Sequence, residues 1–101
     1  DSKKVSFEMY QSGKSVEEIA KERALSSGTI ESHLAYYVGL GELDVKLFLA
    51  EEKLKKIVEY FESVENKSFG AAKAQLGDEV NYGDLRMAMS YLESKQIKQK
   101  N

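Results

Sequence analysis

Apolar residues recur at helical spacing along most of the chain, and short polar breaks divide this pattern into separate segments. Between residues 15 and 38 the pattern predicts two short helices joined by a tight turn. Each helix has one apolar side, formed by Val16, Ile19 and Ala20 in the first and by Ile30, Leu34, Tyr37 and Val38 in the second. Two short helices packed across a tight turn are typical of a helix-turn-helix.

Polar residues mark where both of these helices begin. Ser15 followed by Glu18 predicts a capping box, in which the hydroxyl and the carboxylate each bond a backbone amide of the first turn. Ser26 after Leu25 predicts the N-cap of the second helix. Ala20 supplies a small side chain where the two helices would cross. In a helix-turn-helix the second helix is the one offered to a nucleic-acid groove.

Further helices are expected on both sides of this pair. A leading helix covers residues 2–12, with Ser2 as its cap and Gly13 at its end. Asp44 is expected to cap a short helix that follows the motif. The longest helix is expected over residues 50–64, where apolar residues form a single stripe.

The last third of the chain predicts a helical hairpin. Ser68 and Asn81 cap its two helices, and residues 94–101 are expected to form a frayed basic tail. No alternating strand pair follows Gly39, so a winged variant of the motif is not favoured. The predicted fold is therefore all-α, with a helix-turn-helix three-helix bundle followed by a long helix and a C-terminal helical hairpin. The expected segments of this one compact domain are 1–43, 44–66, 67–93 and the tail 94–101.

Length and composition narrow the class of protein. The chain has 101 residues, enough for one modest core, and it contains neither cysteine nor proline. Without cysteine it has no disulfide framework and no thiolate metal site. No apolar run approaches the ~20 residues of a membrane helix, so a soluble, cytoplasmic protein, nucleoid-associated in a bacterium, is expected. The start at Asp1 without methionine indicates a fragment of a longer protein.

Charge restricts how the chain could bind nucleic acid. Fifteen basic and seventeen acidic residues give a formal net charge of −2, whereas dedicated DNA-binding domains are usually basic. Any contact with DNA would therefore use a local basic patch. Basic residues gather near both ends of the chain and would merge into one patch if the termini approached each other: Lys3, Lys4, Lys14, Lys21, Arg23, Lys95, Lys98 and Lys100.

The second motif helix carries the candidate contact residues. With Ile30 inward, a helical wheel turns outward Gly28, Ser32, Ala35 and Tyr36. The hydroxyls on this helix and its first amides could bind phosphate oxygens. No basic residue lies between Arg23 and Lys46, so sequence-specific reading of bases is not expected. The predicted DNA-contact set is Ser27, Thr29, Ser32 and Tyr36, supported by Lys21 and Arg23. A packing or docking role for the same helix remains open.

Other polar residues predict structural contacts rather than chemistry. His33 is the only histidine, and we expect it to make a polar contact at the seam between helices, because a lone histidine cannot build a metal site. Arg86 is expected to pair with Asp84 or Glu79. The spacing of acidic and basic residues in 51–56 is typical of i,i+4 pairs on a solvated helix, namely Glu51–Lys55 and Glu52–Lys56. No nucleophile, phosphate loop or placed carboxylate pair indicates an enzyme.

Two families share motifs with this chain. EIAKERALSSGTIESHL, residues 18–34, resembles the helix-turn-helix of LuxR-type regulators. A longer resemblance covers nearly all of residues 2–93 and links the chain to the C-terminal helix-turn-helix domain of bacterial RecQ-family helicases. It rests on a GKS turn, EEIA, TIESHL, GELD, EEKLKKI and LGDEVNYGDLRMAM, in that order.

The RecQ resemblance implies a specific set of expectations. The chain would be an accessory domain of an ATP-dependent DNA helicase and would hold single-stranded or forked DNA by its backbone during repair or recombination. The fragment itself would be no enzyme and would carry no cofactor, since ATP and magnesium would be bound by the parent helicase. The alternatives are a module that docks other domains of the helicase and, from the LuxR-type pattern, the DNA-binding domain of a transcription regulator.

Overall fold

The computed structural model describes residues 1–100, with side chains through Lys98, and this part of the chain is helical without any strand. The predicted all-α fold is confirmed. The helices are α1 (Ser2–Gln11), α2 (Val16–Arg23), α3 (Ser27–Gly39), α4 (Glu51–Ser63), α5 (Phe69–Leu76) and α6 (Tyr82–Lys100), with short 3-10 turns η1 (Val45–Leu47) and η2 (Gly77–Glu79). None of these helices is long and apolar enough to cross a membrane.

The starts of α2 and α3 follow the predicted caps. Ser15 and Glu18 form a reciprocal capping box, and the Ser26 hydroxyl accepts from the Thr29 amide. The predicted cap of α1 is wrong by one residue. The carboxylate of Asp1, rather than the Ser2 hydroxyl, accepts from the amides of the first turn. Ser2 is instead the first residue inside the helix.

Aromatic and aliphatic side chains join α1, α2 and α3 into a three-helix unit. The rings of Phe7 on α1 and Tyr37 on α3 stack with centroids 3.9 Å apart and planes within 7° of each other. Ile19 on α2 and Ile30 and Leu34 on α3 are completely buried in the same core. Burial of such side chains supplies most of the stability of short helices.

The second half of the chain repeats the same arrangement of helices. α4, α5 and α6 contact one another as α1, α2 and α3 do, and residues 77–81, which include η2, connect the second helix of this unit to the third. In each of four helices the residue four positions after the N-cap is fully buried: Ile19, Ile30, Ala72 and Leu85. α4, which lies within the predicted helix over residues 50–64, packs as the first helix of this second three-helix unit.

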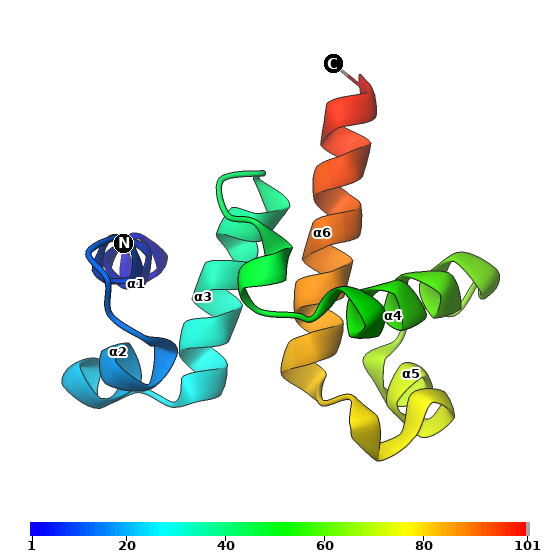
Figure 1. Cartoon of the computed structure of the whole chain (residues 1–101), viewed down its shortest axis with the longest axis horizontal. Helices are drawn as coiled ribbons and strands as arrows, with labels where there is room; N and C mark the ends of the chain where they lie inside the picture. The colour runs from blue at the N-terminus through cyan, green and yellow to red at the C-terminus, as the bar shows by residue number, and fades with distance from the viewer. Residues whose placement is uncertain (101) are drawn as a thin grey trace.

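The third helices of the two units lie side by side. α3 and α6 run in the same direction and form the most extensive helix–helix contact of the described chain (Figure 1). Gly39 on α3 lies beside Ser90 on α6, and a Cβ added at Gly39 would make an ordinary van der Waals contact with Ser90 at 3.8 Å. The N-terminal turns of both helices consequently lie at the same end of the molecule.

α6 is longer than the sequence pattern predicts. It is the longest helix and extends through residues 94–100, so the predicted frayed tail is wrong over this range, and Asn101 lies outside the described residues. Neither glycine nor proline interrupts these residues, and Glu93, Lys95 and Gln96 are good helix formers. Ser94 is buried and bonds the Tyr91 carbonyl, which ties the first turn of this extension to the packed helix.

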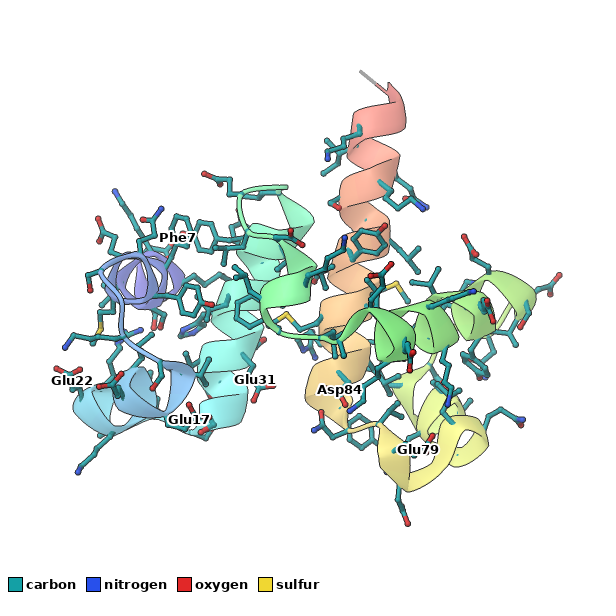
Figure 2. The ribbon with its side chains drawn as sticks, viewed as in Figure 1. Phe7, Glu17, Glu22, Glu31, Glu79 and Asp84 are labelled. Atoms are coloured by element: carbon teal, nitrogen blue, oxygen red, sulfur yellow. The ribbon has the colours of Figure 1, made fainter. Side chains whose placement is uncertain are left out.

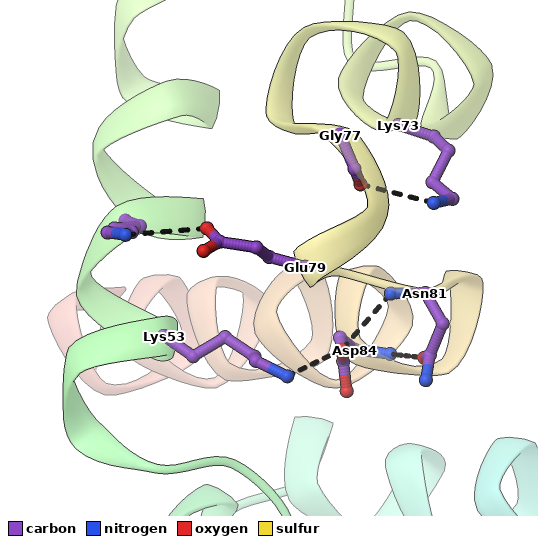
Figure 3. A network of polar contacts seen from close by, with 7 residues as sticks. Lys53, Lys73, Gly77, Glu79, Asn81 and Asp84 are labelled. Carbon is purple, nitrogen blue, oxygen red and sulfur yellow. Dashed lines mark hydrogen bonds and ion pairs between the residues drawn. The ribbon is translucent and has the colours of Figure 1, made fainter.

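Polar contacts connect α4 to the start of α6. Asn81 and Asp84 cap α6 reciprocally, and Lys53 on α4 reaches the same Asp84 carboxylate at 3.3 Å (Figure 3). Lys56 pairs with Glu79 at 3.6 Å. Lys53 and Lys56 of α4 thus pair across the fold. The i,i+4 pairs that the spacing predicts, Glu51–Lys55 and Glu52–Lys56, are not formed among the described residues.

The expected ion pair of Arg86 is also wrong. Asp84 and Glu79 are taken by the lysines of α4, and the Arg86 guanidinium lies over the ring of Phe69 on α5, 5.5 Å from its centroid. A cation over an aromatic face is attracted without its charge being neutralised. Arg86 therefore stays an exposed, positioned positive charge.

Candidate nucleic-acid interface

α3 lies between α1 and α2 on one side and α6 on the other. Ala35, which the helical wheel places outward, is only 2% exposed, so this part of the prediction is wrong. The wheel assumed one covered side, whereas α6 covers a second side that includes Gly39. A helix that reads a major groove must leave its outer side free to enter the groove. α6 occupies part of that side in this chain.

The open side of α3 is a narrow strip. At 3.6 residues per turn, Ser32, Tyr36, Thr29 and Leu40 fall within an arc of about 80°. Tyr36 is 49% exposed at the middle of this strip. The Lys3 ammonium of α1 lies 5.2 Å from the centroid of the Tyr36 ring. The strip therefore combines hydroxyls, an exposed aromatic ring and a lysine from a neighbouring helix.

Two of the predicted contact residues lie in the first turn of α3. Ser27 is exposed, and the Thr29 hydroxyl lies 2.9 Å from the hydroxyl of Ser26. Because Ser26 also accepts from the Thr29 amide, this pair of hydroxyls forms part of the cap of α3. Thr29 retains a structural role whatever it contacts outside the domain.

Arg23 is engaged within the domain. Its guanidinium donates to the Ser2 carbonyl at 2.7 Å, to the Ser2 hydroxyl at 3.0 Å and to the Ser6 hydroxyl at 2.6 Å. Ser6 is completely buried, and its hydroxyl also lies 2.8 Å from Nδ1 of His33. The predicted polar contact of His33 at a helix seam is confirmed. Arg23, Ser6 and His33 together connect α2, α1 and α3.

Burial lowers the pKa of His33, and the positive charges of Arg23 and Lys3 lower it further. Both effects disfavour the imidazolium, the first by removing water and the second by like-charge repulsion. The fold therefore favours the neutral imidazole of His33 over the imidazolium.

The remaining basic residues do not form the merged patch. Lys21 is exposed in the last turn of α2, whereas Lys14 pairs with Glu22 at 3.0 Å. Figure 1 shows the N-terminus beside α1 on one side of α3 and the end of α6 on the other side. Lys95 and Lys98 on α6 therefore lie far from the basic residues of α1 and α2.

A second group of residues flanks the α3 strip, and the sequence did not single it out as a site. Gly28 and Ser32 of α3 and Tyr82 and Arg86 of α6 line a shallow hollow of about 300 Å³. Tyr82 is 55% exposed. The sequence does place Tyr82 and Arg86 four residues apart, and hence on one face of a helix. It does not show that they lie near α3, because that depends on the packing of α6.

Acidic side chains gather at the same end of the molecule. Glu17 of α2, Glu31 of α3 and Asp84 of α6 line a neighbouring hollow, and Figure 2 shows Glu31 and Asp84 near the lower ends of α3 and α6. Burial raises the pKa of Glu31, and the negative charges of Asp84 and Glu17 raise it further. The negative charge of this cluster disfavours an anion such as phosphate at the base of α3.

Within the described residues, no group of three or more histidine, cysteine, aspartate or glutamate side chains is arranged to hold a metal ion. The groups exposed on and beside α3 are hydroxyls, tyrosine rings and single cations.

Comparison with known proteins gives one match. The model of a protein family described as "Helix-turn-helix domain" matches residues 2–89, which include both three-helix units up to the middle of α6. No curated protein and no solved structure matches the chain significantly.

Proposed function

Because this chain belongs to a helix-turn-helix domain family, we propose that it is an accessory nucleic-acid-binding domain that holds DNA through its backbone. Helix-turn-helix domains are commonly used for nucleic-acid binding, although a fold alone does not assign a function. The proposal therefore depends on what the surface of α3 offers to DNA.

The observation that carries this proposal is the form of the α3 surface. α6 covers one outer side of α3, and the remaining strip presents Ser32 and Tyr36 beside Lys3. α3 itself carries no arginine or lysine, the residues that most often read guanine in a groove. Hydroxyls, a lysine and an aromatic ring suit phosphates and unpaired bases instead. We accordingly propose binding that is weak and indifferent to duplex sequence.

The resemblance to RecQ-family helicases supports a more specific proposal, namely a role beside a helicase motor. The motifs shared with the C-terminal domain of RecQ-family helicases run from the GKS turn, residues 13–15, to Met89. On this basis the chain would act beside an ATP-dependent helicase motor and hold single-stranded or forked DNA during repair or recombination. ATP and magnesium would be bound by the motor of the parent protein.

A docking module within the helicase is the second candidate. The net charge of −2 and the acidic cluster of Glu17, Glu31 and Asp84 favour it over a general affinity for nucleic acid. The covered side of α3 is consistent with this role too, because α6 shows that the helix can serve as a packing surface. Binding experiments separate the two candidates.

Fluorescence anisotropy tests the proposal directly. Labelled single-stranded, duplex and forked DNA would be titrated with the chain at two salt concentrations. We expect binding that weakens as salt rises, with a slope corresponding to ~2–4 phosphate contacts. The preferred DNA structure would then identify the role in unwinding. Absence of binding to all three at low salt would contradict the proposal and favour the docking module.

A matched pair of variants would locate the contact surface. Lys3→Glu reverses the charge beside Tyr36, whereas Lys55→Glu makes the same change on the exposed side of α4. We expect the first to weaken binding to every DNA and the second to have little effect. Equal effects would show that only the net charge matters.

A further inference from the structure

The hollow between the N-terminal turns of α3 and α6 has the features of a small binding site. Its volume is about 300 Å³, at the lower end for ligand sites. Two glycines, Gly28 and Gly83, leave backbone bare on its walls. Residues of both three-helix units meet here, so the site exists only when α6 is packed on α3.

Tyr82 provides an aromatic surface at the edge of the hollow. It lies in the first turn of α6 and is more than half exposed, so its ring can be reached from solvent. An exposed ring beside a shallow hollow is the arrangement on which unpaired bases stack, because every base has an aromatic face.

Arg86 provides a charge one turn further along the same face. Its guanidinium is held by the Phe69 ring and takes part in no ion pair among the described residues. An arginine that is positioned yet not neutralised can pair with an incoming phosphate.

Glu31 distinguishes this site from a simple phosphate site. Its side chain lies against Gly83, where any Cβ would overlap the Glu31 carboxylate, so the glycine is what permits this position. A carboxylate accepts hydrogen bonds from base N–H groups and repels phosphate. The hollow thus offers an acceptor at Glu31, a stacking surface at Tyr82 and a cation at Arg86.

We propose that this hollow binds one unpaired guanine of a nucleic-acid strand, stacked on Tyr82 and donating N1–H and N2–H to the Glu31 carboxylate, with Arg86 on the adjacent phosphate. Guanine is the base whose Watson–Crick edge presents two neighbouring donors to the two oxygens of one carboxylate. Cytosine and adenine each place an acceptor beside their amino group, and thymine has a single donor. The inference rests on the proposed nucleic-acid binding and specifies its base preference.

Short labelled strands test this preference. The probes are an oligothymidylate and the same strand with one central guanine, cytosine or hypoxanthine, measured by fluorescence anisotropy. We expect the guanine strand to bind about tenfold more tightly than the cytosine strand, in line with a two-bond base contact. Hypoxanthine keeps N1–H but lacks the N2 amino group, so its affinity should fall between the two.

Three variants test the three contacts. Glu31→Gln should abolish the guanine preference without weakening binding to oligothymidylate, whereas Glu17→Gln removes the same charge outside the hollow and should preserve it. Tyr82→Ala should weaken all strands by about fivefold or more, and Tyr82→Phe should not. Arg86→Gln should lower the magnitude of the salt slope by about one contact, while Lys55→Gln leaves it unchanged.

The outcomes separate this inference from the function on which it rests. Equal binding of the guanine and cytosine strands, or a preference that survives Glu31→Gln, would overturn the guanine site and leave DNA holding by the α3 strip intact. Failure of every strand to bind at low salt would overturn both. Circular dichroism of each variant would show that the helices are retained.

Discussion

The hydroxyl of Ser6 lies 2.8 Å from Nδ1 of His33 and also accepts a hydrogen bond from Arg23. Arginine can only donate, so the Ser6 oxygen accepts from Arg23 and its own proton is free for His33. When Ser6 donates this proton to Nδ1, the neutral imidazole carries its own proton on Nε2. A buried serine on α1 thus links an arginine of α2 to the histidine of α3.

Removal of the Ser6 hydroxyl should destabilise the domain. Ser6→Ala leaves the Arg23 and His33 groups without their shared partner in a partly buried seam. We expect the free energy of unfolding to fall by about 1–3 kcal/mol, measured by urea denaturation. Ser63→Ala is the matched control, because that exposed hydroxyl bonds only the nearby Tyr60 carbonyl. An equal effect of both changes would contradict a special role for the seam.

Stability should also depend on the protonation of His33. Its pKa in the fold lies below the ordinary 6.5, so the unfolded chain binds the proton more readily. The free energy of unfolding should therefore fall as pH decreases from about 6.5 to the lowered pKa, and be unaffected by this group above 6.5. The difference between the wild-type chain and His33→Gln, measured across this range, isolates the effect. Titration of His33 by NMR at 6.5 or higher would contradict it.

The protonation of Glu31 should give stability the opposite dependence on pH. Its pKa in the fold is raised above the ordinary 4.5, so the folded chain binds the proton more readily and stability falls as pH rises through that window. At neutral pH the carboxylate is therefore unfavourable, and Glu31→Gln should stabilise the fold by less than about 1 kcal/mol, since the group is partly solvated. Glu59→Gln on the exposed side of α4 should change stability little. Loss of stability in Glu31→Gln would refute the prediction.

Changes at Lys21 and Arg23 should affect different properties, DNA binding and stability respectively, although the sequence predicts both residues as DNA contacts. Lys21→Glu should weaken DNA binding and lower the magnitude of the salt slope by about one contact, with an unchanged melting temperature. Arg23→Gln should lower the melting temperature, because its guanidinium holds Ser2 and Ser6 of α1. Anisotropy and thermal denaturation of both variants provide the check. Identical behaviour of the two variants would contradict this division.

A larger side chain at position 35 tests whether α6 covers Ala35. Ala35→Leu should destabilise the fold by about 1–3 kcal/mol, because the larger side chain would not fit the contact between α3 and α6. Ser27→Leu adds a large side chain to an exposed position of the same helix and should have a small effect. The comparison uses urea denaturation, and a neutral Ala35→Leu would mean that α6 does not cover α3 in solution.

The sequence predicts the local features of this protein well. The helix class, the capping box of Ser15 and Glu18 and the caps at Ser26 and Asn81 all depend on atoms within about four residues of one another. Such contacts form in any setting that allows the helix, so the residue pattern is sufficient to predict them. The cap of α1 shows the limit of this approach, since Asp1 and Ser2 are both good caps and the choice between them is not encoded in spacing.

Only the tertiary structure determines which residues neighbouring helices cover and which partners the charged residues contact. Ala35 is buried because α6, more than forty residues later in the chain, packs along α3 in the same direction. Arg86 is directed to Phe69 because lysines of α4 take the nearby carboxylates. Helical periodicity shows that a helix has an apolar side but cannot show how many neighbours cover it, because that depends on how separate segments pack.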